Sequence, residues 1–184
     1  MTQHQGIDQA WQQEWADQYA QPLPAREARG QTMLLPFMLG RETFAVATRD
    51  VSAATEAGQP VALPGRRGRV VWGLLHVESQ LVLAADLKRL LQPAPLKADA
   101  EIPRGRFARV LIFGHGLETF AAAVDDVPGC FRLDPASLSP MPVTAPAATV
   151  ALALGQLRHG GVQMTVLDGA RLHAALTDDL RGAA

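Results

Sequence analysis

The sequence of 184 residues is poor in the residue types that several classes of binding site require. It has one cysteine, Cys130, so neither a disulfide framework nor a cysteine-based zinc site is expected. The 17 lysines and arginines balance 18 acids to a net charge of −1, and aromatic residues make up only 5%. We therefore expect neither a basic surface for nucleic acid or anionic lipid nor a platform for base stacking.

Long hydrophobic runs are also missing. Charged residues, glycine or proline interrupt every apolar stretch well short of the roughly 20 residues that span a bilayer. Residues 1–17 have no basic start followed by an apolar run, so they do not predict a signal peptide. Hydrophobic residues still make up 48% of the chain, which is enough for a sizeable core. We therefore expect a globular, cytoplasmic protein.

Residues 1–31 differ from the rest of the chain. Trp11, Trp15 and Tyr19 recur every four residues, with Ile7 one turn earlier, which predicts an amphipathic helix. The proline-rich stretch that follows ends this helix and forms a linker. Three interpretations remain open: the helix folds back onto the main domain, docks into a partner's groove, or belongs to an unstructured tail. Trp11, Trp15 and Tyr19 are therefore candidate partner-binding residues.

From Met33 onward the pattern changes to short strands separated by turns. The predicted strands are residues 34–39, 43–48, 70–76, 80–85, 108–113, 118–124, 150–158 and 162–167. The predicted helices are residues 86–91 and 168–176. Each helix begins at an aspartate, Asp86 or Asp168, whose carboxylate accepts hydrogen bonds from free amides of the first turn. We assign both aspartates to helix capping.

The two halves of this pattern form an internal repeat. When residues 40–51 are aligned with residues 116–127, 8 of 12 positions are identical. Looser matches follow: Gly73 with Gly155, Asp86 with Asp168, Arg89 with Arg171 and Leu90 with Leu172. The repeat predicts a mainly β fold of two tandem SH3-like barrels of about five strands each. We expect residues 33–91 and 106–176 to form one barrel each within a domain of residues 32–180, with a binding groove between the barrels.

No catalytic or cofactor motif is found. Metalloprotease, serine-hydrolase and phosphate-loop motifs are absent, and the glycines around His115 lack the rest of a dinucleotide motif. The scattered histidines and the pair Asp125-Asp126 fit ordinary turn or surface roles, and Cys130 fits a small, partly buried residue. The arginines of residues 65–69 fit a solvated loop that is compatible with an acidic partner. We expect no enzyme activity, no metal and no cofactor.

Taken together, residues 33–176 resemble the CheW family, the coupling adaptors of bacterial chemosensory systems. The matching pieces stand in the family's order: Phe37-Met38-Leu39-Gly40, Glu42, Phe44-Ala45-Val46, Val51, Leu63-Pro64, Val71-Trp72-Gly73-Leu74-Leu75, residues 81–87, Val124-Asp125-Asp126-Val127, Pro140, Pro142, Gly155 and residues 164–168. The resemblance implies two SH3-like barrels without catalytic activity. It also implies an adaptor that links the cytoplasmic tip of a methyl-accepting chemoreceptor to the regulatory domain of a CheA-type histidine kinase.

One stretch departs from the family pattern. Where family members usually carry Asn-x-Arg-Gly, this sequence has His76-Val77-Glu78-Ser79, so an acid replaces a guanidinium and a serine replaces a turn glycine. On the resemblance, the candidate partner-binding residues are Val51, Gly73, His76, Glu78 and Ser79. Val51 would offer apolar contact at the groove, and Gly73 either allows close backbone approach or forms a bulge. Glu78 either selects a partner by charge or is only solvated.

Three hypotheses for function follow. The first is a non-catalytic adaptor of a chemosensory complex, recruited to membrane-associated receptor arrays without inserting into the membrane. The second is a specialised regulatory module of a non-taxis pathway that controls surface motility or second-messenger production. That module would bind a kinase through the barrels and another partner through the N-terminal helix. The third is a small enzyme with its site between the barrels, which no constellation of residues supports.

Overall fold

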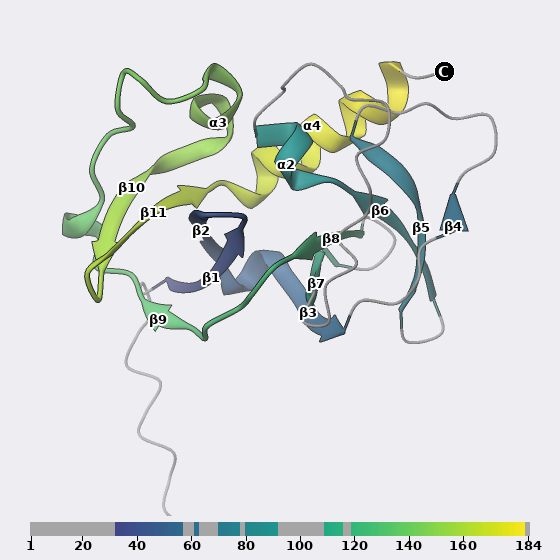
Figure 1. Ribbon diagram of the computed structural model, residues 1–184, viewed down its shortest axis with the longest axis horizontal. Helices are drawn as coiled ribbons and strands as arrows, with labels where there is room; N and C mark the ends of the chain where they lie inside the picture. Colours follow the sequence, from purple (N-terminus) through teal and green to yellow (C-terminus); the bar gives the residue numbers. More distant parts are fainter. Residues whose placement is uncertain are drawn as a thin grey trace, which may run out of the picture. The chain divides into compact units, whose positions relative to one another are not determined.

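The computed structural model describes residues 32–56, 61–62, 70–77, 80–91, 109–115 and 119–182. The predicted N-terminal helix with Trp11, Trp15 and Tyr19 lies outside the described residues, as do Glu78 and Ser79. Residues 32–184 form one unit, and its strands make two sheets with a few helices beside them (Figure 1). The mainly β fold predicted from the repeat is confirmed.

The first sheet, which we call the first barrel, has five strands in the order β10-β11-β2-β1-β9. These strands are β1 (Met33–Leu39), β2 (Glu42–Ala47), β9 (Phe131–Arg132), β10 (Ala153–His159) and β11 (Val162–Leu167). β1 and β2 form one antiparallel hairpin, and β10 and β11 form another. The two hairpins join through a parallel pairing of β2 with β11, which places Thr165 beside Phe44.

The second sheet, the second barrel, has six strands in the order β3-β7-β8-β6-β5-β4. These strands are β3 (Val51–Glu56), β4 (Val61–Ala62), β5 (Val71–Val77), β6 (Gln80–Ala85), β7 (Arg109–Phe113) and β8 (Phe120–Val124). Its two central hairpins, β7–β8 and β5–β6, again join through a parallel pairing, here of β6 with β8. That pairing places Leu83 beside Phe120, as Thr165 lies beside Phe44 in the first barrel.

The two barrels are therefore quasi-equivalent, but each combines strands from both halves of the sequence. The hairpin β1–β2 pairs with β10–β11, whereas its repeat equivalent β7–β8 pairs with β5–β6. The expected division into barrels of residues 33–91 and 106–176 does not hold, because the two hairpins are exchanged between the halves. Residues 40–51 and 116–127 of the two hairpins are identical at 8 of 12 positions, so their sequences do not reveal which strand pair each hairpin joins.

Alternation along the strands distributes the apolar side chains over three cores. The core between the sheets includes Leu35, Phe37, Leu39, Phe44, Val46, Leu111, Phe113, Phe120, Ala122 and Val124. The first barrel encloses Leu34, Ala45, Leu157, Met164 and Val166, and the second encloses Leu75, Val82, Ala84, Val110, Ile112 and Ala121. Phe113 joins the sheets at their middle. Its ring stacks on Phe120 with centroids 4.9 Å apart and meets Phe37 edge-on at 6.3 Å.

Aspartate caps begin two of the helices, α2 (Leu87–Leu91) and α4 (Gly169–Gly182). The Asp86 carboxylate accepts hydrogen bonds from the amides of Lys88 and Arg89 at 2.9 and 3.2 Å. The Asp168 carboxylate accepts from the amides two and three residues further on, at 3.0 and 3.3 Å. Each cap also pairs with an arginine, since Arg89 lies 3.2 Å from Asp86 and Arg171 lies 3.3 Å from Asp168. The predicted capping role is confirmed.

Two predicted elements have different bounds in the structure. Residues 150–158 were expected to be one strand, but the helix α3 (Ala147–Leu152) takes their first part and β10 begins at Ala153. Proline at the start of an alanine-rich segment favours helix, because its fixed φ suits the first turn and alanine has the highest helix propensity. The predicted helix 168–176 extends to Gly182 as α4.

Candidate functional site

The structure places three of the predicted site residues on the second barrel. Val51 begins β3, is half-buried and packs against the core between the sheets. Gly73 is buried at a bulge in β5, and its repeat equivalent Gly155 lies at the matching bulge in β10. A Cβ atom on Gly155 would lie 2.5 Å from the Ser139 carbonyl oxygen, so a glycine at that bulge has a structural reason.

His76 lies on an exposed apolar face of the second barrel. Val61 of β4 is paired with Leu74 of β5, and His76 is paired with Leu81 of β6. Residues directly opposite each other, and every second residue along a strand, share a face of a sheet. Val61 and Leu81 are both 65% exposed, on the two strands that flank β5.

We call this surface, made by Val61, Leu74, Leu81 and Leu83, the apolar strip. Leu83 is paired with Leu74 and packs against the core between the sheets. The strip is therefore the outward continuation of that core, along the strands β4, β5 and β6 that lie together in Figure 1. Sequence reasoning missed Val61 and Leu81, because the apolar run from Leu81 to Ala85 hides which side chains face the interior.

The equivalent face of the first barrel has the opposite chemistry. The parallel pairings equate Thr165 with Leu83, since each lies beside the matching phenylalanine of its barrel. The antiparallel registers then equate Gln156 with Leu74 and Gln163 with Leu81. Three apolar positions of the second barrel are thus two carboxamides and a hydroxyl in the first, and we call these three residues the polar ladder.

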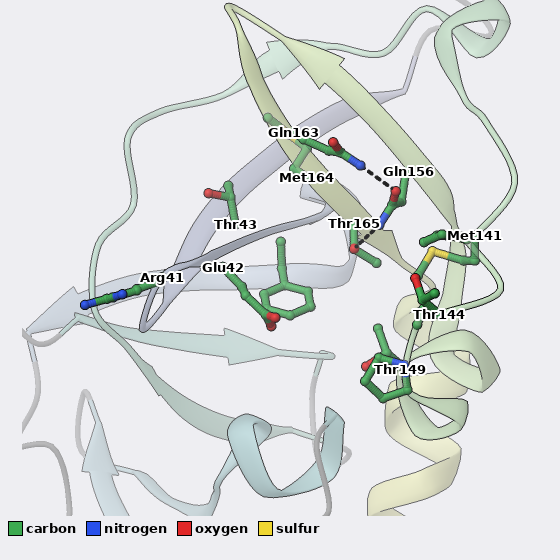
Figure 2. Close-up of a pocket in the computed structure, with 14 residues that line it drawn as sticks. Arg41, Glu42, Thr43, Met141, Thr144, Thr149, Gln156, Gln163, Met164 and Thr165 are labelled. Atoms are coloured by element: carbon green, nitrogen blue, oxygen red, sulfur yellow. Dashed lines mark hydrogen bonds between the residues drawn. The ribbon is translucent and has the colours of Figure 1, made fainter.

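Hydrogen bonds connect the polar ladder in one direction. Gln163 Nε2 donates to Gln156 Oε1 at 2.7 Å, and Gln156 Nε2 donates to Thr165 Oγ1 at 3.5 Å (Figure 2). The three side chains come from two neighbouring strands, so the antiparallel register alone brings them together. The sequence signal for this ladder is weak, because single glutamines at unrelated spacings carry no motif.

A cavity of about 370 Å³ lies over the polar ladder. Its lining residues are Arg41, Glu42, Thr43, Phe44, Met141, Pro142, Thr144, Ala145, Pro146, Thr149, Gln156, Gln163, Met164 and Thr165. The Glu42 side chain extends into this space, whereas Arg41 extends away from it (Figure 2). The cavity therefore combines an apolar bed with acceptor oxygens and a carboxylate.

A second cavity of about 350 Å³ adjoins the first, sharing Arg41, Glu42 and Phe44 with it. At its border the Asp125 carboxylate accepts a hydrogen bond from the Gly40 amide and pairs with Lys88 at 3.1 Å. Partial burial alone would raise the pKa of Asp125, but the Gly40 amide and the Lys88 ammonium outweigh it and lower this pKa below its ordinary value. Asp125 thus ties the β1–β2 turn to α2.

The other candidates for chemistry have structural roles. His115 Nε2 lies 2.7 Å from the Arg49 carbonyl oxygen, and the His159 ring stacks on Phe131 at 4.0 Å. Asp126 Oδ1 accepts from the amide of the next residue, so it does not form an acid–base pair with Asp125. Cys130 was expected to be partly buried and is instead exposed, because it lies in the open segment before β9.

The described part of the chain holds neither a metal-binding cluster nor a membrane-spanning helix. Residues 32–182, without the gaps named above, hold no group of three or more histidine, cysteine or acidic side chains placed to bind a metal ion. Within the same residues, no helix is long and apolar enough to cross a membrane.

Comparisons with known proteins agree with this architecture. A family model described as "CheW-like domain" matches residues 33–176. The solved structure of the scaffolding protein TtCheW from Thermoanaerobacter tengcongensis is similar to this chain, with a TM-score of 0.61 at 15% sequence identity. That match covers 75% of this chain and 89% of TtCheW. None of the curated proteins matches the sequence.

Proposed function

This chain belongs to the CheW-like domain family, a family of non-catalytic scaffolds, and from that membership we propose that it couples chemoreceptors to a CheA-type histidine kinase. In this proposal it works at the cytoplasmic side of receptor arrays and binds its partners through protein surfaces alone. The regulatory domain of the kinase and the cytoplasmic tip of a receptor are the two partners.

The apolar strip is the observation that carries this proposal. An adaptor needs a surface that stays exposed in the free protein and becomes buried in the complex. Val61 and Leu81, each 65% exposed, supply such a surface next to the core. Strands lie about 4.8 Å apart, so a three-stranded strip is roughly 10 Å wide and fits one side of a helix or an edge of another barrel.

His76 adds a polar group at one end of the strip. It is exposed, and it lies opposite Leu81 on the same face. His76 is also the first residue of the stretch in which this sequence departs from the family pattern, so the start of that departure lies on the proposed contact surface. This position favours a partner set that differs from that of typical members, including the second candidate, a regulatory module that binds a kinase outside taxis.

A reconstitution with purified components tests the proposal. The full-length protein is mixed with a CheA-type kinase and membranes that contain a chemoreceptor, and both sedimentation with the membranes and kinase autophosphorylation are measured. Leu81→Gln is expected to weaken binding to at least one partner by about tenfold or more, because it removes one of the two most exposed apolar side chains of the strip.

Val162→Gln is the control, because Val162 is an exposed apolar residue on a strand of the first barrel that belongs to neither the apolar strip nor the polar ladder. It should leave the binding of both partners unchanged. If the kinase is bound and the receptor is not, the regulatory-module function replaces the coupling function. If the wild-type protein binds neither partner, or if Leu81→Gln binds both as tightly as the wild type, the coupling function through this strip is wrong.

A further inference from the structure

The polar ladder is not required by the fold. Its three positions are Leu74, Leu81 and Leu83 in the quasi-equivalent barrel, where the strand pairings and the interior packing are the same in kind. Leucine would therefore satisfy the backbone geometry at these positions. The glutamines and the threonine therefore occupy positions where the fold accepts either apolar or polar side chains, and a cavity lies directly over them.

The hydrogen bonds of the ladder fix how its oxygen atoms are presented. Because Gln163 Nε2 donates to Gln156 and Gln156 Nε2 donates to Thr165, both carboxamides have a set orientation. With Gln163 Nε2 directed at Gln156, Gln163 Oε1 lies on the other side of its carboxamide, and a carboxamide oxygen can accept two hydrogen bonds (Figure 2). The Glu42 carboxylate and the Thr144 hydroxyl line the same cavity, which adds acceptor oxygens on its other sides (Figure 2).

The floor of the cavity is apolar. Phe44, 3% exposed, forms this floor, and Met141 and Pro142 close the side formed by the segment before α3. An apolar floor below several acceptor oxygens matches a ligand with an aliphatic or flat body and a head that donates many hydrogen bonds. The volume of about 370 Å³ is near the low end for ligand pockets, which suits a single long side chain.

We infer that this cavity binds the side chain of an arginine presented by an extended segment of a partner protein. The guanidinium donates to the Glu42 carboxylate and to the oxygen atoms of Gln163 and Thr144. Its stem lies over Phe44 and beside Met141. Arginine fits better than lysine because its planar head carries five donors in a fixed arrangement, which suits acceptors spread over several walls.

This site is separate from the apolar strip and goes beyond the proposed function. The two lie on quasi-equivalent faces of different barrels, so one chain presents an apolar docking surface and a polar docking site. A partner with an apolar contact surface cannot bind the polar site, and a partner that presents an arginine cannot bind the apolar strip, because the two surfaces have opposite chemistry. The pair of sites therefore fixes which barrel faces which partner.

Peptide titration followed by NMR tests the inference on the full-length protein. The probe is the capped peptide acetyl-Gly-Arg-Gly-amide, added to ¹⁵N-labelled protein while the side-chain amide signals of Gln156 and Gln163 are followed. Those signals should shift on titration. The matched peptide with citrulline in place of arginine has the same shape without the charge, and it should bind at least about tenfold more weakly.

Two variants of the cavity and one outside it complete the test. Glu42→Gln and Gln163→Leu should each weaken binding of the arginine peptide by about tenfold. Gln163→Leu introduces leucine, the residue found at the equivalent position of the second barrel, Leu81. Leu81→Gln should bind it like the wild type. Equal binding of the two peptides, or arginine binding that survives both cavity variants, overturns the inference. Neither result bears on whether the apolar strip binds a kinase or a receptor.

Discussion

The two barrels have the same plan and opposite surfaces. Equivalent positions in the two interiors are apolar: Leu75 pairs with Val82 in the second barrel, and Leu157 pairs with Met164 in the first. On the outer face of the same strands, leucines of one barrel are replaced by glutamines and a threonine. The comparison separates two demands on the sequence. Positions inside each barrel keep their apolar character because the fold depends on it, whereas positions on the opposite face of the same strands take either apolar or polar side chains.

The largest effect is expected where the two barrels differ in burial. Leu172 is 0% exposed, while its repeat equivalent Leu90 is only partly buried. We expect Leu172→Ala to lower the free energy of unfolding by about 3 kcal/mol and Leu90→Ala by about 1 kcal/mol, because the cavity left behind is better enclosed at Leu172. Denaturation with urea measures both values. Equal losses would mean that the two helices pack on the core to the same extent.

A smaller and equal effect is expected at the two caps. Asp86→Ala and Asp168→Ala each remove two amide hydrogen bonds, and we expect each to cost about 1 kcal/mol of unfolding free energy. Asp178, exposed in the middle of α4, supplies the control Asp178→Ala, which should stay within about 0.5 kcal/mol of the wild type. If only one cap variant is destabilised, the two caps are not equivalent.

The smallest effect concerns Asp125, whose repeat equivalent is Arg49. The pKa of Asp125 is lower in the folded than in the unfolded chain, so its ionised form stabilises the fold above the unfolded pKa. That contribution is lost as the pH falls through the folded pKa. Its size should be under about 1 kcal/mol, because the side chain is partly solvated and the interaction is screened.

Asp125→Asn should therefore lower the thermal midpoint at pH 7 and have a smaller effect below about pH 4, where the wild-type carboxyl is itself becoming protonated. Raising the salt concentration should also reduce the difference between variant and wild type, since Lys88 is an exposed partner. If the difference in thermal midpoint between Asp125→Asn and the wild type stays constant from pH 7 to pH 3, the negative charge of Asp125 does not stabilise the fold.

The sequence predicts the local parts of this fold well. Hairpins such as 34–39 with 43–48 follow from alternation and a glycine turn, and the caps follow from aspartates before apolar helices. The exchange of hairpins was not predictable in the same way, because it depends on contacts between distant segments. The sequence predicts only part of the surface around the apolar strip. His76 was identified from the family pattern, but Val61 was not, because it lies in a proline-flanked stretch without a strand pattern. The polar ladder appears only once the register of β10 and β11 is known.

The exchange of hairpins also sets the order in which the chain can fold during synthesis. The second barrel has all its strands once Val124 has been made, but the hairpin β1–β2 must wait for β10 and β11, the last strands of the chain. Until then the apolar face of that hairpin can be covered by the second barrel, while the outer edge of β2 has no strand beside it. An unpaired strand edge can pair with another chain. The nascent protein is therefore most prone to aggregation after the second barrel is complete and before β10 and β11 have been synthesised.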